Sequence, residues 1–173
     1  EELETLVTEN TILVSVILAH NEVGVIQPMA DIAQLTHAVG AKLMSDCVQA
    51  VGKMPVNLEA LGIDIAIVSA HKCYAPTGCG ALIIKDSNAL QPWILGGTQQ
   101  QKLRGGTVHV LGTELFAKGL EYCCQELPNA VDIAAWVKQL KEGVKNIQII
   151  ASPDQENQLW NTVSLAVPGK LSH

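Results

Sequence analysis

The feature that most constrains the fold is a continuous apolar run at residues 12–18, which read Ile-Leu-Val-Ser-Val-Ile-Leu. A β-branched run of this kind is typical of a strand that is buried on both faces. Residues 30–39 follow with Ile32, Leu35 and Val39 spaced three and four positions apart, and Gly40 stands where a helix would end. A buried strand followed by a helix predicts a sheet that is covered by helices.

Three further strands are predicted at residues 42–46, 63–69 and 80–85. Strands that alternate with helices form mostly parallel sheets through right-handed crossovers. The link between Lys72 and Gly80 is too short for a helical crossover, so strand 80–85 is predicted to run antiparallel to its predecessor. The predicted fold class is therefore α/β, with a mostly parallel sheet and one antiparallel strand.

A long loop is predicted at residues 86–106, which contain Pro92 and two glycine pairs. A loop of this length inside a compact domain is more often functional than idle. Residues 107–127 then predict a helix that is apolar nearly all round, so both of its sides are expected to be covered. Pro128 and Asn129 are predicted to end this helix.

The last part of the chain changes in pattern. An amphipathic helix is predicted around Ile133, Val137 and Leu140, and strands are predicted at residues 147–151 and 162–167. These elements indicate the start of a smaller α+β domain. We therefore predict that residues 1–126 belong to a large domain and that residues 127–173 begin a small C-terminal domain.

Composition excludes several classes of function. The chain has 173 residues, 48% hydrophobic and 16% charged, with a net charge of −6 and no basic run, so nucleic acid is not an expected partner. No apolar stretch approaches the roughly 18 residues that span a bilayer, and the glutamate-rich first ten residues are unlike a signal peptide. Those first residues read like the middle of a helix, which indicates an internal segment of a longer protein.

Five cysteines are present, Cys47, Cys73, Cys79, Cys123 and Cys124. None forms a C-x-x-C metal pair, so no metal site is predicted. An odd number of cysteines without a secretion signal favours reduced thiols in a cytoplasmic location. All five lie in or beside apolar segments and are expected to be small buried residues.

Lys72 carries the strongest chemical signal, because it closes the sequence Ser-Ala-His-Lys directly after the buried strand at 63–69. A lysine at the mouth of a strand can form a Schiff base. Asp46 ends the neighbouring strand, where a carboxylate can hold a pyridinium nitrogen protonated. These are the two electronic demands of pyridoxal phosphate chemistry.

Four motifs carry a resemblance to a known family: residues 20–28 (His-Asn-Glu-Val-Gly-Val-Ile-Gln-Pro), 46–49 (Asp-Cys-Val-Gln), 69–72, and the glycine-rich 96–107. In this order and spacing they resemble the middle of cysteine desulfurases, in the class V aminotransferase family of pyridoxal phosphate fold type I. Residues 10 to 125 match closely. The resemblance implies an enzyme that uses pyridoxal 5'-phosphate to take sulfur from L-cysteine, leaving L-alanine and an enzyme persulfide.

The resemblance also implies roles for residues around the cofactor ring. Lys72 would be the Schiff-base lysine and would then move the Cα proton of the substrate. Asp46 would pair with the ring nitrogen, and Gln49 would hydrogen-bond the phenolic oxygen. Asn21 would lie near that oxygen and the substrate.

The phosphate would be held by a second group of residues. Ser69 and His71 are the donors that the resemblance implies within one subunit. In the family the glycine-rich loop crosses a dimer interface, so Thr107 would bind the phosphate of the partner subunit's cofactor. A homodimer is therefore implied, and a protein that accepts the sulfur is a further possible partner.

Each residue also has an ordinary structural explanation. An aspartate after a strand is usually a turn or helix-cap residue, and a His-Lys pair usually lies on the solvated surface. Three other functions share these motifs: a selenocysteine lyase, another class V enzyme such as a transaminase or kynureninase-like hydrolase, and a non-catalytic scaffold. The family's sulfur-accepting cysteine and substrate-binding arginine are expected outside this chain. The chain alone is therefore expected to be inactive. Iron–sulfur cluster assembly and tRNA thiolation are the two processes that the sulfur of such an enzyme could serve.

Overall fold

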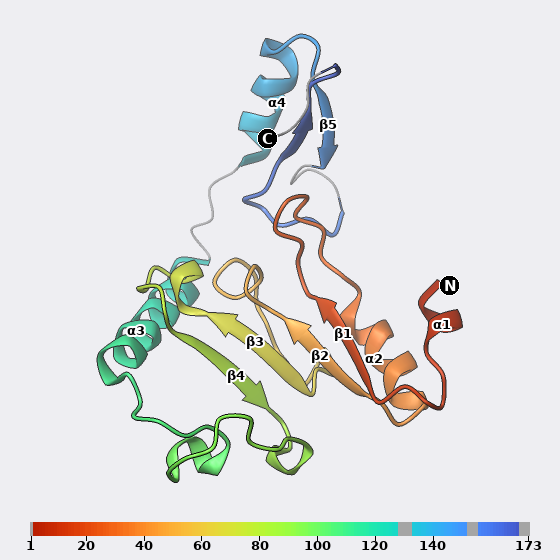
Figure 1. Ribbon diagram of the computed structural model, residues 1–173. Helices are drawn as coiled ribbons and strands as arrows, with labels where there is room; N and C mark the ends of the chain where they lie inside the picture. The colour runs from red at the N-terminus through yellow and green to blue at the C-terminus, as the bar shows by residue number, and fades with distance from the viewer. Residues whose placement is uncertain (1, 128–132, 152–155, 170–173) are drawn as a thin grey trace.

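The computed structural model describes residues 2–127, 133–151 and 156–169. Its main sheet has the strand order β1-β2-β3-β4. These strands are β1 (Leu13–Ile17), β2 (Lys42–Asp46), β3 (Ile65–Ser69) and β4 (Gly80–Ile84). Strands β1, β2 and β3 are parallel, whereas β4 pairs with β3 in the antiparallel sense (Figure 1). The predicted α/β sheet with one antiparallel strand is confirmed.

Helix α2 (Met29–Ala38) follows β1 and covers one face of the sheet, as predicted. Met29, Ile32 and Ala33 are buried on its inner side and pack with Leu18 and Leu43 in the main core. Val14 and Leu18 of the 12–18 run also belong to this core. The expectation that this run is buried on both faces is wrong for the described residues, because Ile12 is 85% exposed and Leu13 is 44% exposed. A short helix α1 (Glu2–Leu6) precedes β1.

Helix α3 (Val110–Glu126) is covered on one side only. Its buried residues are Gly112, Phe116, Gly119 and Cys123, whereas Val110 and Leu111 are each 67% exposed. The expectation that both sides are covered is wrong for the described part of the chain. Only the side that carries Phe116, Gly119 and Cys123 is buried against the rest of the structure. Pro128 and Asn129, which were predicted to end this helix, lie outside the described residues.

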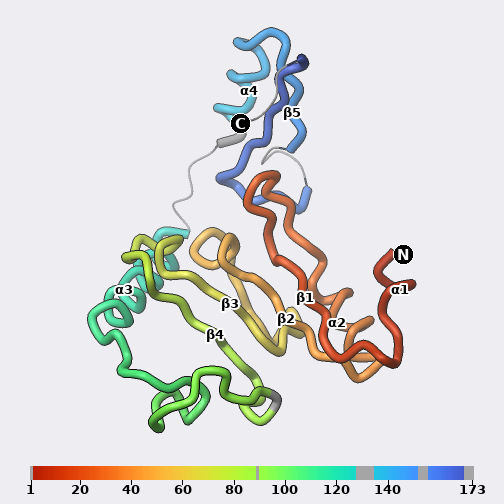
Figure 2. The backbone as a smooth tube through the Cα atoms, viewed as in Figure 1, coloured from red at the N-terminus to blue at the C-terminus, as the bar shows by residue number. Residues whose placement is uncertain are grey.

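The last elements are α4 (Ile133–Gly143), β5 (Gln148–Ala151) and β6 (Ser164–Ala166), and β5 and β6 pair in a separate antiparallel sheet. Figure 2 shows this group beyond the carboxyl ends of β1 and β2. The intervening chain returns to the main core, where Leu159 is 2% exposed and packs with the same cluster as Leu18 and Leu43. The predicted helix and both predicted strands are confirmed.

Three short 3-10 helices lie in the loops: η1 (Ala70–Lys72), η2 (Ser87–Ala89) and η3 (Gln99–Lys102). The loop after β4 therefore has some local structure of its own. Gly105 lies so close to Gly96 that a Cβ on Gly105 would be 2.8 Å from the Gly96 Cα, which accounts for glycine at both positions. In the described ranges, every helix is too short or too polar to cross a membrane.

Candidate cofactor site at the strand ends

The carboxyl ends of three parallel strands meet at one edge of the sheet. Asp46 pairs in register with Ile17 on one side and Ile67 on the other. Strands lie about 4.8 Å apart and rise about 3.3 Å per residue, so the Cα of Ser69 is roughly 8 Å from that of Asp46. Open α/β sheets bind ligands at this edge.

Asp46 is held in place by the chain that follows it. Its Oδ1 accepts a hydrogen bond of 2.9 Å from the Val48 backbone N–H, and the Ala50 N–H donates to the Cys47 carbonyl at 3.0 Å. Within the described residues, Oδ2 of Asp46 accepts no hydrogen bond. Oδ1 therefore fixes the orientation of the carboxylate, and Oδ2 remains able to accept a hydrogen bond from a ligand.

The segment after β3 gathers a hydroxyl, an imidazole and an amine. Ser69 Oγ lies 2.8 Å from His71 Nδ1, and His71 and Lys72 are both exposed. Ala70 beneath them is fully buried and its N–H donates to the Cys79 carbonyl at 3.1 Å. The turn is thus anchored through its backbone while its polar side chains stay accessible.

This donor set fits the chemistry of pyridoxal phosphate. The amine of Lys72 is accessible for a covalent bond to an aldehyde, and the carboxylate of Asp46 suits a protonated ring nitrogen. The Ser69 hydroxyl and the His71 ring can donate to phosphate oxygens. All of these groups come from two adjacent strand ends.

Lys53 is a site residue that the motifs did not single out. Its Nζ donates a hydrogen bond to Oε1 of Gln49, four residues earlier in the chain. Burial lowers the pKa of Lys53, and the nearby positive charge of Lys72 lowers it further. A spacing of four residues brings side chains together on a helix, but residues 48–53 form turns, so the sequence carries no clear signal for this pair.

Asn21 lies in the loop that joins β1 to α2, and its side chain is exposed. The loop closes on itself through hydrogen bonds of 2.9 Å from the His20 N–H to the Val25 carbonyl and from the Gly24 N–H to the His20 carbonyl. The Ile26 N–H donates to the Asn157 carbonyl at 2.8 Å. The C-terminal segment therefore holds the loop that carries Asn21.

Thr107 is not brought together with the other predicted site residues. It is exposed, and within the described ranges no hydrogen bond joins it to them. It follows the loop that leaves β4, whose arrow in Figure 1 points away from the ends of the other three strands. Within a single chain, the structure gathers Asp46, Gln49, Ser69 and His71–Lys72 at one edge and leaves Thr107 outside that group.

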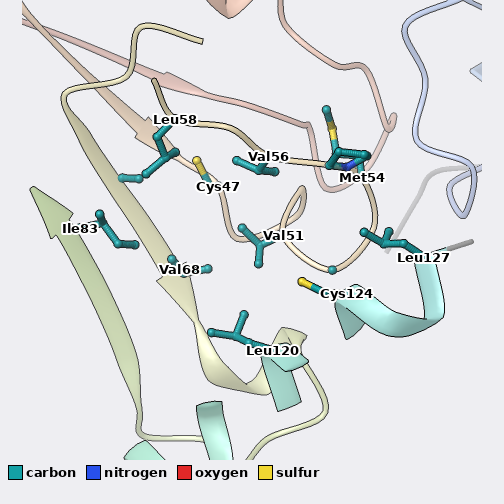
Figure 3. Close-up of a pocket in the computed structure, with 13 residues that line it drawn as sticks. Cys47, Val51, Met54, Val56, Leu58, Val68, Ile83, Leu120, Cys124 and Leu127 are labelled. Carbon is teal, nitrogen blue, oxygen red and sulfur yellow. The ribbon is translucent and has the colours of Figure 1, made fainter. Parts of the chain in front are cut away.

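A cavity of about 260 Å³ lies on a different part of the molecule (Figure 3). Apolar side chains line it, including Val51, Val56, Leu58 and Val68 from the sheet side and Leu120 from α3. None of the seven predicted site residues lines this cavity. The polar groups at the strand ends therefore do not face this cavity.

Three cysteines behave as buried apolar residues. Burial raises the pKa of Cys47 and of Cys123, and burial together with the adjacent Cys123 raises the pKa of Cys73 to about 11. These thiols remain protonated at neutral pH and are poor nucleophiles. The prediction of burial is wrong for Cys124, which is exposed because it lies about 100° around α3 from Cys123. Cys79 is half-buried, 3.3 Å from His109 Nδ1.

The sequence pattern of the Aminotransferase class-V family matches residues 1–173. The chain belongs to this family. Its relatives include a cysteine desulfurase of Bradyrhizobium diazoefficiens, 36% identical over 90% of this chain and 40% of the relative, and the cysteine desulfurase IscS of Dictyoglomus turgidum, 31% identical over 96% of this chain and 43% of the relative. The chain thus spans less than half of either relative.

Solved structures agree with the class V assignment. A NifS-like protein superposes with a TM-score of 0.87 at 38% identity, over 96% of this chain and 47% of that protein. The NifS-like protein of Rickettsia africae gives a TM-score of 0.85 at 34% identity, over 98% of this chain and 48% of that protein. SspA, solved in complex with cysteine, superposes with a TM-score of 0.74 at 27% identity, over 96% of this chain and 46% of that protein. These similarities extend along nearly the whole chain.

Proposed function

We propose that this chain is part of a pyridoxal 5'-phosphate-dependent cysteine desulfurase. The single observation that carries the proposal is that Asp46 and the Ser69–Lys72 turn lie on adjacent strand ends in a chain whose relatives are cysteine desulfurases. The overall reaction converts L-cysteine and an enzyme thiol into L-alanine and an enzyme persulfide. The relatives favour this function over a selenocysteine lyase, another class V enzyme or a scaffold.

The bound cofactor supplies an electron sink for the bond-breaking steps. Lys72 would provide the amine that holds the cofactor covalently, and the same amine would then be placed to move a proton at the substrate Cα. The Asp46 carboxylate would hold the ring nitrogen protonated, using the oxygen that the Val48 N–H leaves available.

Other polar side chains position the cofactor. Gln49 would donate to its phenolic oxygen, Asn21 would lie near that oxygen and the substrate, and Ser69 and His71 would hold the phosphate. The hydrogen bond between Ser69 and His71 orients both groups toward one anion.

The proposal extends to the whole protein. L-Cysteine is the substrate, which agrees with the cysteine complex solved for SspA, and the sulfur-accepting cysteine and a carboxylate-binding arginine belong to parts of the protein outside this chain. The protein is a cytoplasmic homodimer in which Thr107 contacts the phosphate of the partner's cofactor. It supplies sulfur to an acceptor protein, as in iron–sulfur cluster assembly, and residues 127–173 begin a smaller domain.

Replacement of the reactive amine tests this function. In the full-length protein that contains this chain, Lys72→Ala should abolish the visible absorbance band of the covalently bound cofactor and the release of sulfide from L-cysteine. Lys85→Ala, at the far end of β4, should change neither. An unchanged spectrum in Lys72→Ala would show that another group binds the cofactor.

A further inference from the structure

Lys53 contacts the predicted site residue Gln49 through its side chain and the C-terminal segment through its backbone. Its side chain is half-buried, and its Nζ donates to Oε1 of Gln49. The charge of Lys72 acts on the same ammonium group, so Lys53 lies close to both Gln49 and Lys72.

The chemistry of the two side chains determines the direction of this hydrogen bond. An ammonium group has three donors and no acceptor, whereas a glutamine amide has one acceptor oxygen and one donor nitrogen. Only Oε1 of Gln49 can therefore face Lys53. The Nε2 donor of Gln49 must point away from Lys53, and it is available to an acceptor at the strand ends.

The backbone of Lys53 is held from two sides. The indole Nε1 of Trp160 donates to the Lys53 carbonyl at 2.8 Å. The preceding Gly52 has φ +77°, and a Cβ there would lie 2.7 Å from the Cβ of Cys123 in α3. The helix α3 and the C-terminal segment thus place the residue whose side chain contacts Gln49.

We propose that Lys53 is a positioning residue of the cofactor site, which turns the Gln49 amide so that Nε2 donates to the phenolic oxygen of the bound cofactor. This inference rests on the proposed function, because it needs Gln49 to contact the cofactor ring. The ring oxygen is an acceptor that carries negative charge, so an amide nitrogen stabilises it and an amide oxygen repels it. Lys53 selects the first arrangement.

A double-mutant cycle in the full-length apoenzyme tests the proposal. The dissociation constant of pyridoxal phosphate is measured by fluorescence titration for Lys53→Met, Gln49→Leu and the double variant. Each single variant should weaken binding about 3- to 10-fold, as expected for the loss of one hydrogen bond. The double variant should bind like Gln49→Leu alone, because Lys53 acts only through Gln49.

Three controls separate positioning from a general structural role. Lys53→Arg keeps a cationic donor and should retain most of the affinity. Lys85→Met removes a distant positive charge and should not change the affinity. Thermal unfolding of the apoenzyme should be similar for Lys53→Met and Lys85→Met.

The outcomes distinguish two kinds of failure. If the parent protein does not bind pyridoxal phosphate at all, the proposed function is wrong. If the parent binds but Lys53→Met keeps its affinity, or weakens binding equally in the Gln49→Leu background, the positioning role is wrong. A Gln49→Leu variant with normal affinity would also overturn it, because no contact would remain for Lys53 to orient.

Discussion

At the residue scale, the site depends on side chains that are oriented by bonds to their own neighbourhood. Asp46 receives the Val48 N–H, Ser69 contacts His71, and Gln49 is held by Lys53. Each of these contacts spans four residues or fewer along the chain. The polar groups are therefore preorganised locally before any cofactor arrives, which reduces the cost of ordering them on binding.

We predict that Asp46→Asn will separate cofactor binding from turnover. The amide keeps the shape of the side chain but loses the negative charge that, in the proposed function, holds the ring nitrogen protonated. The phosphate contacts survive, so the full-length variant should still bind pyridoxal phosphate, while sulfide release from L-cysteine should fall about 100- to 1000-fold. Near-normal turnover would show that Asp46 is only a turn cap. Asp86→Asn, beyond the far end of β4, serves as the matched control.

At the element scale, α3 supports the Lys72 turn by a very close approach. A Cβ on Gly119 would lie 2.0 Å from the Cys73 carbonyl oxygen, and Cys73 follows Lys72 directly. Cys73 and Phe116 belong to the same buried cluster. The position of the lysine turn therefore depends on how closely this helix can pack.

We predict that Gly119→Ala will destabilise this contact. The added methyl group cannot fit without a shift of α3, and overpacking of this kind costs about 1–3 kcal/mol of unfolding free energy. The affinity for pyridoxal phosphate should fall as well, because the turn that carries Lys72 must move. Both quantities are measured on the full-length protein by urea unfolding and by titration of the apoenzyme.

Gly143→Ala is the matched control for this change. Gly143 is the last residue of α4, and nothing lies within 4 Å of a Cβ placed there. The variant should be as stable as the original protein or slightly more stable, since alanine favours helices. Equal stability of Gly119→Ala and Gly143→Ala would contradict the close approach of α3.

A second element-scale contact joins α2, β2 and β3 at the opposite edge of the sheet. Asp64 accepts hydrogen bonds from His37 Nε2 at 2.8 Å and from the Leu43 N–H at 2.9 Å, and Lys42 Nζ lies 3.6 Å away. Burial acts to raise the pKa of Asp64, but these hydrogen bonds and the positive charge outweigh it and lower the pKa. The ionised form is therefore favoured in the folded protein.

We predict a pH-dependent effect of Asp64→Asn. A carboxyl group with a lowered folded-state pKa stabilises the protein above its unfolded-state pKa of about 4, and this contribution disappears as the pH falls through the folded-state value. The variant should lose about 1–3 kcal/mol of unfolding free energy at neutral pH. The difference between the two proteins should shrink in acid.

Urea unfolding of the full-length apoenzyme at neutral and acidic pH measures this effect. The exposed Glu59, changed to Gln, is a control that should alter stability little at either pH. A loss in Asp64→Asn that stays constant with pH would mean that the effect comes from packing and not from the charge.

At the scale of the whole molecule, Thr107 forms no hydrogen bond with the described residues at the strand ends and is exposed. The loop that ends at Thr107 carries Trp93, which is 94% exposed, and Leu95, which is 80% exposed. Such side chains on an extended loop agree with the proposed homodimer, in which each subunit completes the site of the other across a two-fold interface.

We predict that subunits with different lesions will restore activity together. A full-length Lys72→Ala protein is mixed with a Thr107→Ala protein under conditions of subunit exchange. In the mixed dimer one site collects both lesions and the other collects neither, so sulfide release should rise above the mean of the two separate proteins. Activity that stays at the mean, after exchange is verified by mass spectrometry, would refute a shared site.

The order of strands and helices could be predicted from the sequence because it depends on local patterns. Buried strands appear as apolar runs, α2 as a three-and-four spacing, and the antiparallel direction of β4 follows from the short link between Lys72 and Gly80. Asp46 and Lys72 could be singled out from the same order, since they follow two strands of the sheet, whereas the other candidate residues were implied by the family resemblance. These features are properties of short segments and of their succession.

Packing between distant segments was decided only by the tertiary structure. The sequence could not indicate that Trp160 contacts Lys53, that Gly119 faces Cys73, or that α3 is exposed at Leu111. Each of these depends on the relative placement of elements that are far apart along the chain, and a residue's own neighbours in sequence do not encode that placement. The apolar pattern of α3 could likewise predict that the helix packs, but only the folded structure shows which of its faces this chain covers.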